Sequence, residues 1–94
     1  MEEKIRIILK ITEQVLRHNA RHPEMDIFMT TYGNDGKSWV SLNVDNPNRK
    51  HEKADIFILS CTNIIEEASI SKLEETYQEV MTFIQSIKEA KNNA

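Results

Sequence analysis

The apolar positions near the start of the chain recur at helical spacing and predict a helix over residues 2–21. A proline at position 23 disfavours helical conformation at His22, so we expect the helix to end there. Acidic residues at its beginning and arginines near its end suit the helix dipole. One stripe of this helix should be buried; it holds Ile5, Ile8, Leu9, Val15 and Leu16, with Thr12 on the same face.

Alternating apolar and polar positions predict a β-hairpin in the next part of the chain. The segments 25–32 and 37–44 have strand character and flank the sequence GNDG, whose residues tolerate the positive φ of a tight turn. A turn centred on Asn34 and Asp35 makes one face of the hairpin wholly apolar, whereas a slip by one residue would destroy that face. The expected pairs are Met29 with Val40, Ile27 with Leu42 and Met25 with Val44.

The same pairing places three aromatic side chains on the opposite face of the hairpin. Thr30 should lie opposite Trp39, with Phe28 and Tyr32 on the diagonals. The full set expected on this face is Phe28, Thr30, Tyr32, Trp39, Ser41 and Asn43.

A third strand and a second helix are predicted in the rest of the chain. Residues 54–61 are apolar on both faces, with Ile56 and Ile58 on one and Cys61 on the other, which favours a buried strand. Residues 62–70 are ambiguous. The final helix should span about 71–90, starting at a capping box of Ser71 and Glu74. Its apolar stripe comprises Leu73, Tyr77, Val80, Ile84 and Ile87.

The predicted layout is α-β-β-β-α, a three-stranded antiparallel meander with two helices packed on it, in a single α+β domain spanning residues 1–94. Double-stranded-RNA-binding domains share this order, but their hallmark is a basic cluster at the start of the last helix. Here that place has the sequence SISKLEE, with Lys72 alone among acids, so we reject that assignment. In size, layout and acidic balance the chain resembles a loose group of small phage and mobile-element proteins, some of which inhibit host defence enzymes.

Composition bounds the environment and the kind of ligand. The 94 residues carry a net charge of −3, which argues against a dedicated duplex-DNA binder, because such proteins usually need a dominant basic face. Cys61 is the single cysteine, so no internal disulfide forms and a cytoplasmic location is expected. The apolar run near the N-terminus is too short for a membrane span and lacks the basic start of a signal peptide.

No residue pattern predicts catalysis or a bound cofactor. Both glycines belong to one turn, so no glycine-rich phosphate loop exists, and Cys61 in an apolar strand is expected to be a small buried hydrophobe. His18 and His22 lie four residues apart on a helix, but zinc needs three or four ligands. We therefore expect a non-enzymatic protein without a metal, in which these histidines are exposed polar residues closing the helix.

Two classes of binding function fit the aromatic face. The first is a protein interface, in which the protein forms a homodimer or binds and blocks another protein, because monomers rarely leave a large apolar patch bare. Its expected contact residues are Phe28, Tyr32, Trp39, Ile56 and Ile58. The alternative is a single-stranded nucleic-acid binder that stacks bases on the same aromatics. Its phosphate contacts would be Arg49, Lys50 and Lys53, although the basic run also suits a solvated loop.

Overall fold

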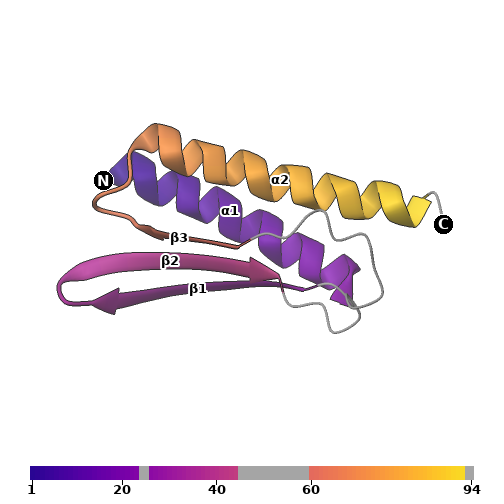
Figure 1. Cartoon of the computed structure of the whole chain (residues 1–94), viewed down its shortest axis with the longest axis horizontal. Coiled ribbons are helices and arrows are strands. Elements are labelled where there is room, and N and C mark those ends of the chain that lie inside the picture. The colour runs from indigo at the N-terminus through magenta and orange to yellow at the C-terminus, as the bar shows by residue number, and fades with distance from the viewer. Residues whose placement is uncertain (24–25, 45–59, 93–94) are drawn as a thin grey trace.

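The chain runs helix, three strands, helix, as the sequence predicts. The computed structural model describes residues 1–23, 26–44 and 60–92. The three strands form one antiparallel sheet in the order β1-β2-β3, and the two helices pack against each other and on the sheet (Figure 1). The elements are α1 (Glu2–Arg21), β1 (Ile27–Asn34), β2 (Lys37–Val44), β3 (Ser60–Ile64) and α2 (Ile70–Asn92).

Helix α1 has the predicted bounds but buries a different face. The predicted stripe is wrong at three positions, because Ile5, Leu9 and Leu16 are 42%, 61% and 64% exposed. The buried face is centred on Ile11 and comprises Ile7, Ile8, Ile11, Val15 and His18. This face lies between α2 and the sheet. The helix has two overlapping apolar stripes, and it buries the stripe that contacts both α2 and the sheet.

The hairpin turns one residue later than predicted. Asp35 and Gly36 have φ of 57° and 77°, the left-handed conformation that a two-residue hairpin loop requires. Pairing therefore starts at Asn34 opposite Lys37, and the predicted pairs are wrong by two residues. A two-residue shift preserves the side of the sheet on which every side chain lies, so the predicted inner and outer faces survive. The observed pairs include Met29 with Leu42, Ile27 with Val44 and Tyr32 with Trp39.

Strand β3 extends further than predicted, and α2 begins earlier. Residues 54–59 of the predicted strand lie outside the described residues, but pairing continues through Ile64, which faces Trp39. The predicted capping box is wrong. Ser69 caps α2 instead, because its Oγ accepts a hydrogen bond of 3.0 Å from the backbone N–H of Lys72.

One core fills the space between the helices and the inner face of the sheet. Asn63 on β3 also reaches α2 there, donating a hydrogen bond of 3.4 Å from Nδ2 to Oγ1 of the buried Thr76. No helix in the described ranges is long and apolar enough to cross a membrane. The buried apolar residues are Ile7, Ile8, Ile11, Val15, Ile27, Val40, Leu42, Ile65, Leu73, Val80 and Phe83.

The turn geometry predicts different effects for the same substitution at the two glycines. Gly36→Ala should lower the free energy of unfolding by about 1–2 kcal/mol, because a Cβ resists the left-handed conformation. Gly33 lies in the strand, and a Cβ there meets only Lys37 O at 3.9 Å. Gly33→Ala should therefore be neutral or stabilise by up to about 1 kcal/mol, through the lost entropy of the unfolded chain. Urea unfolding of both variants measures this, and equal destabilisation by the two would contradict the turn assignment.

Candidate functional site

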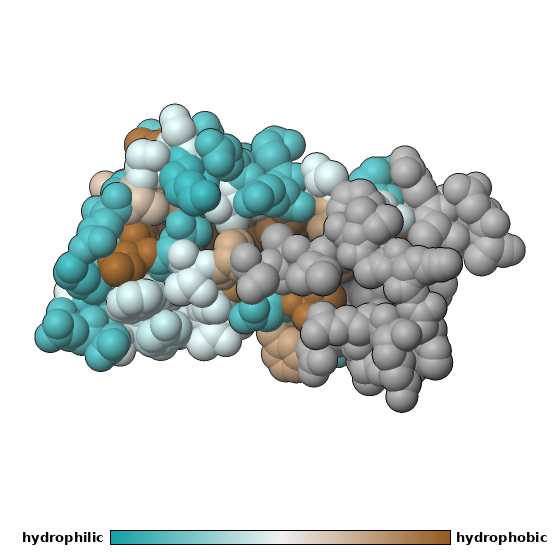
Figure 2. Space-filling model, viewed as in Figure 1, coloured by the Kyte–Doolittle hydropathy of each residue, from teal (hydrophilic) through white to brown (hydrophobic). Residues whose placement is uncertain are grey.

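The candidate site is the face of the sheet that points away from the helices. Both helices lie on the other side, so no described element covers this outer face (Figure 1). In Figure 2 the surface over the strands at lower left is mostly pale, with intermediate hydropathy, whereas that over α2 is largely hydrophilic. The register gives the outward side chains: Phe28, Thr30, Tyr32, Trp39, Ser41, Asn43, Thr62 and Ile64.

The row nearest the hairpin turn is aromatic and apolar. Tyr32 faces Trp39, which in turn faces Ile64 on β3. The Tyr32 and Trp39 rings stack, with centroids 5.9 Å apart and planes 12° from parallel. The indole Nε1 of Trp39 is buried and has no hydrogen-bond partner among the described residues. Since buried indole N–H groups usually find an acceptor, this row carries an unmet hydrogen-bonding capacity.

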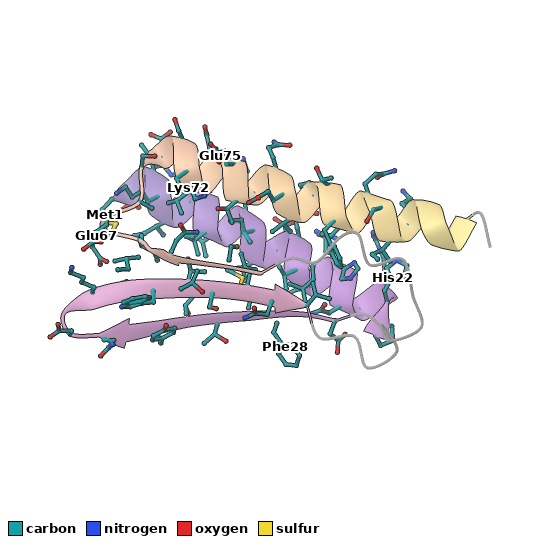
Figure 3. All side chains as sticks on the ribbon, viewed as in Figure 1. Met1, His22, Phe28, Glu67, Lys72 and Glu75 are labelled. Atoms are coloured by element: carbon teal, nitrogen blue, oxygen red, sulfur yellow. The ribbon has the colours of Figure 1, made fainter. Side chains whose placement is uncertain are left out.

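A row of hydroxyl groups separates this aromatic row from Phe28. Ser41 Oγ lies 3.1 Å from Thr62 Oγ1, and Asn43 Nδ2 donates to Ser41 Oγ at 3.4 Å. Phe28 is therefore about 13 Å along β1 from Tyr32, at roughly 3.3 Å per residue. It projects away from the helices and is 54% exposed (Figure 3). The expected continuous patch of three aromatics is wrong, because it depended on the diagonal contact that the observed register removes.

The turn after β3 holds the hairpin end of the sheet in place with charged groups. The backbone N–H of Ser38 donates to the Glu66 carboxylate at 2.8 Å, and the Ile65 N–H donates to Ser38 O at 2.8 Å. This hydrogen bond holds the pKa of Glu66 below its usual value. Lys37 pairs with Glu67, and that contact raises the pKa of Lys37. From α1, Lys4 Nζ donates to Ile65 O at 3.1 Å.

The charges around the aromatic row do not favour phosphate. Glu66 and Glu67 flank it, and the nearby Lys37 is already paired with Glu67. A nucleic-acid backbone that approached this row would meet carboxylates, whereas such sites usually provide a basic groove. The predicted phosphate contacts Arg49, Lys50 and Lys53 lie outside the described residues.

The predicted protein-contact residues fall into three groups. Tyr32 and Trp39 are brought together, Phe28 shares their face at a distance, and Ile56 and Ile58 lie outside the described residues. Ile64 was missed, because residues 62–70 showed no clear pattern. The signal was the continued alternation after Cys61, with Thr62 and Ile64 on one face and Asn63 on the other.

The side chains considered for metal binding or nucleophilic chemistry are His18, His22 and Cys61, and the structure describes all three. His18 is 2% exposed and packs edge-on against Phe83, with ring centroids 6.0 Å apart, so its predicted exposure is wrong. The His22 ring lies 5.2 Å from the His18 ring. Among the described residues, no three His, Cys, Asp or Glu side chains come together as metal ligands. Burial, the largest cause, and the nearby Glu79 raise the pKa of the partly buried Cys61 thiol.

Comparison with known proteins assigns no family. No family model matches the chain, and no curated protein or solved structure is significantly similar to it. The class that the structure itself defines is a small α+β domain with both helices on one face of a three-stranded sheet.

Thiol labelling tests the environment of Cys61. Because its pKa is raised and its side chain is partly buried, native Cys61 should react with a thiol reagent at pH 7 at least about tenfold more slowly than in urea. The denatured chain is the internal control. Equal rates in the two states would contradict its place on the inner face of β3.

Acid should weaken the contribution of Glu66. Its folded pKa is lowered, so its stabilising effect is fully present above the usual Glu pKa of about 4.3 and is lost as the pH falls through the lower folded value. Glu66→Ala should thus lower the melting temperature at pH 7 and have a smaller effect at pH 3. Gln78→Ala, which truncates an exposed uncharged side chain of α2, is the control and should show no such difference between the two pH values. A Glu66→Ala effect that persists at pH 3 would contradict the role of the carboxylate.

Proposed function

We propose that this chain is a non-enzymatic protein-interaction module that binds a partner protein through the outer face of its sheet. The observation that carries the proposal is the stacked pair of Tyr32 and Trp39 on a face opposite both helices. Buried tyrosine and tryptophan side chains contribute a large share of the energy of protein interfaces, because they bury much area and lose little conformational entropy.

The aromatic row supplies both an apolar surface and a hydrogen-bond donor. Tyr32 is 43% exposed and Ile64 is partly buried, so a partner side chain can pack on the row beside Trp39. The unpartnered Nε1 of Trp39 is suited to a carbonyl oxygen of the partner once the ring shifts to admit it. Restoring a hydrogen bond to a buried donor recovers a desolvation cost of about 1–3 kcal/mol.

The hydroxyl row next to the aromatic row favours a partly polar contact with the partner. Thr62 and Thr30 are exposed, and Ser41 lies between them. An apolar centre with a polar margin is the usual composition of an interface that forms and dissociates. A partner that inhibits or regulates by blocking another protein's surface fits this description, and so does a second copy bound face to face.

The test is Trp39→Ala, compared with Thr62→Ala on the same face. Proteins captured by the wild-type chain from an extract of its native cells are identified, and their affinities for the three chains are measured by calorimetry. Trp39→Ala should stay folded by far-ultraviolet circular dichroism and bind about 30-fold more weakly, which corresponds to roughly 2 kcal/mol. Thr62→Ala should bind within about threefold of wild type.

Three outcomes would contradict the proposal. An unfolded Trp39→Ala chain would make this residue part of the core. A folded variant with undiminished binding would exclude the outer face as the binding surface. Capture of single-stranded nucleic acid, lost steeply as salt concentration rises, would favour the alternative function, because only that mode releases condensed counterions.

A further inference from the structure

A groove lies where the second half of α1 runs beside the edge strand β1. The helix crosses the sheet, since Lys4 near its start donates to Ile65 O, beyond β3. Near its end, Asn19 contacts Ile27 at the start of β1 (Figure 1). We call this hollow the α1/β1 groove; it has a volume of about 350 Å³, and the residues that line it include Thr12, Leu16, Asn19, Asp26, Phe28 and Met29.

The backbone edge along the groove is occupied at one end and open along the rest. Asn19 Nδ2 donates to Ile27 O at 3.0 Å, and the Ile27 N–H donates to Asn19 Oδ1 at 2.8 Å, so this amide pairs with the edge as a neighbouring strand would. Because alternate residues face the same edge, the backbone groups of Met29 and Thr31 point outward with those of Ile27. No described residue pairs with them.

This edge lacks the features that usually prevent strands from pairing. Residues 27–34 contain no charged side chain and no proline, and their pairing with β2 continues without a bulge. Native proteins that keep an edge single commonly place lysine, proline or a bulge there, or cover it. A regular row of open N–H and C=O groups is complementary to another extended backbone, so the edge favours a strand as its ligand.

Exposed apolar side chains lie on both sides of the open position. On the helix side, Leu16 is 64% exposed and lines the groove. On the outer face, Phe28 and Tyr32 of β1 are 54% and 43% exposed, and Phe28 projects from the edge strand (Figure 3). A strand added beside β1 would cover parts of all three, because its side chains alternate between the two faces of the sheet.

The charge at the groove favours a basic ligand residue. Of the described residues that line the groove, only Asp26 is charged, and it directly precedes β1 at the end that Asn19 occupies. Arg17 lies on the same half of α1 but pairs with Glu13 at 2.9 Å. A lysine or arginine of a ligand would therefore be complementary to this end of the groove.

We propose that the α1/β1 groove binds an extended segment of a partner protein, which adds a fourth strand to the sheet beside β1. The segment has apolar side chains at successive strand positions and a lysine or arginine next to Asp26. Tyr32 belongs to the aromatic row as well, but the open edge and the groove do not involve Trp39. The proposal therefore does not rest on the proposed function.

The open groups of the edge fix the register of an antiparallel segment. Ligand residues opposite Met29 and Thr31 exchange both N–H and C=O bonds with them, which gives about four hydrogen bonds. Pairing ends before Ile27, because Asn19 already bonds to its outward groups. Antiparallel pairing is the more stable arrangement, and it directs the C-terminal end of the segment toward Asp26.

The same register assigns the side chains of the segment. The two hydrogen-bonded ligand residues point to the helix side, into the groove and toward Leu16. The ligand residue between them lies opposite Thr30 and points to the outer face, with Phe28 and Tyr32 on its diagonals, within reach of a large side chain. We therefore expect β-branched or aromatic residues at these three positions.

The first test selects ligands for the full chain from a displayed library of random peptides. The selected sequences should share a short run of β-branched or aromatic residues that is followed by lysine or arginine. A selection repeated with Asp26→Asn should keep the apolar run and lose the preference for the basic residue. Because this substitution removes only the charge, it separates the electrostatic preference from the shape of the groove.

The second test measures the affinity of the strongest selected peptide by fluorescence anisotropy. Leu16→Glu should weaken binding at least about tenfold, because it places a charge beside the apolar ligand residues. The matched control is Leu9→Glu, which makes the same change at a similarly exposed position of α1 outside residues 12–19. It should bind within about threefold of wild type, and both variants should keep their circular dichroism.

The third test probes the backbone contact directly. Methylating the peptide nitrogen of the ligand residue opposite Thr31 should weaken binding at least about tenfold, because that N–H points toward β1. Methylating the nitrogen of the next ligand residue, which points away from β1, is the matched control and should change the affinity by no more than about threefold. Hydrogen exchange of the Met29 and Thr31 amides should slow when the unmodified peptide is added.

Four outcomes would overturn the proposal. Selection of no binding peptide would do so, as would equal effects of methylation at the two nitrogens. Peptide binding that is lost in Trp39→Ala but kept in Leu16→Glu would place the ligand on the outer face. Edge amides already protected in a chain that sediments as a dimer would assign the edge to a second copy. Binding that persists in Trp39→Ala supports the groove whether or not the proposed function holds.

Discussion

The left-handed backbone at Asp35 and Gly36 sets the arrangement of the whole sheet. A two-residue loop with positive φ at both positions matches the twist of the flanking strands and brings Asn34 opposite Lys37. Everything on the outer face follows from that pair. Tyr32 meets Trp39, the hydroxyl side chains form their own row, and Phe28 is left alone near the far end of β1. Because the backbone N–H and C=O groups alternate along β1, those of Met29 and Thr31 face the outer edge of the sheet.

The sequence predicted the elements well because local signals define them. A helix from residue 2 to 21 followed from apolar spacing and Pro23, and the fold class followed from the order of elements. The faces of the hairpin were also predicted correctly, although the register was not, because an error of two residues leaves side-chain direction unchanged. The pattern of apolar residues could not separate the two registers, since both bury Ile27, Val40 and Leu42 on the inner face.

The errors arose where tertiary contacts choose between equally good local patterns. Helix α1 has apolar residues on more than half of its circumference, and periodicity alone cannot tell which stripe meets α2. The contact of Lys10 with the Tyr77 ring, 4.6 Å from Nζ to the centroid, belongs to that choice. His18 was taken as exposed for the same reason, because the rotation of the helix decides whether position 18 faces Phe83 or water. Of the candidate site, Tyr32 and Trp39 could be placed from alternation. The same alternation continues to Ile64, but only the pairing with β2 shows that Ile64 lies next to Trp39.

The hydrogen bonds of Asn19 make the attachment of β1 to α1 sensitive to deamidation of this side chain. A primary amide offers one donor and one acceptor in the spacing of a peptide group, which is why it can satisfy both backbone groups of Ile27. Deamidation to aspartate keeps the acceptor for the N–H but turns the donor into a second acceptor facing a carbonyl oxygen. One of the two hydrogen bonds between helix and strand then becomes a repulsion, and the first residue of the sheet is held less firmly. A molecule deamidated at Asn19 would thus fray from the start of β1, where the core residue Ile27 lies.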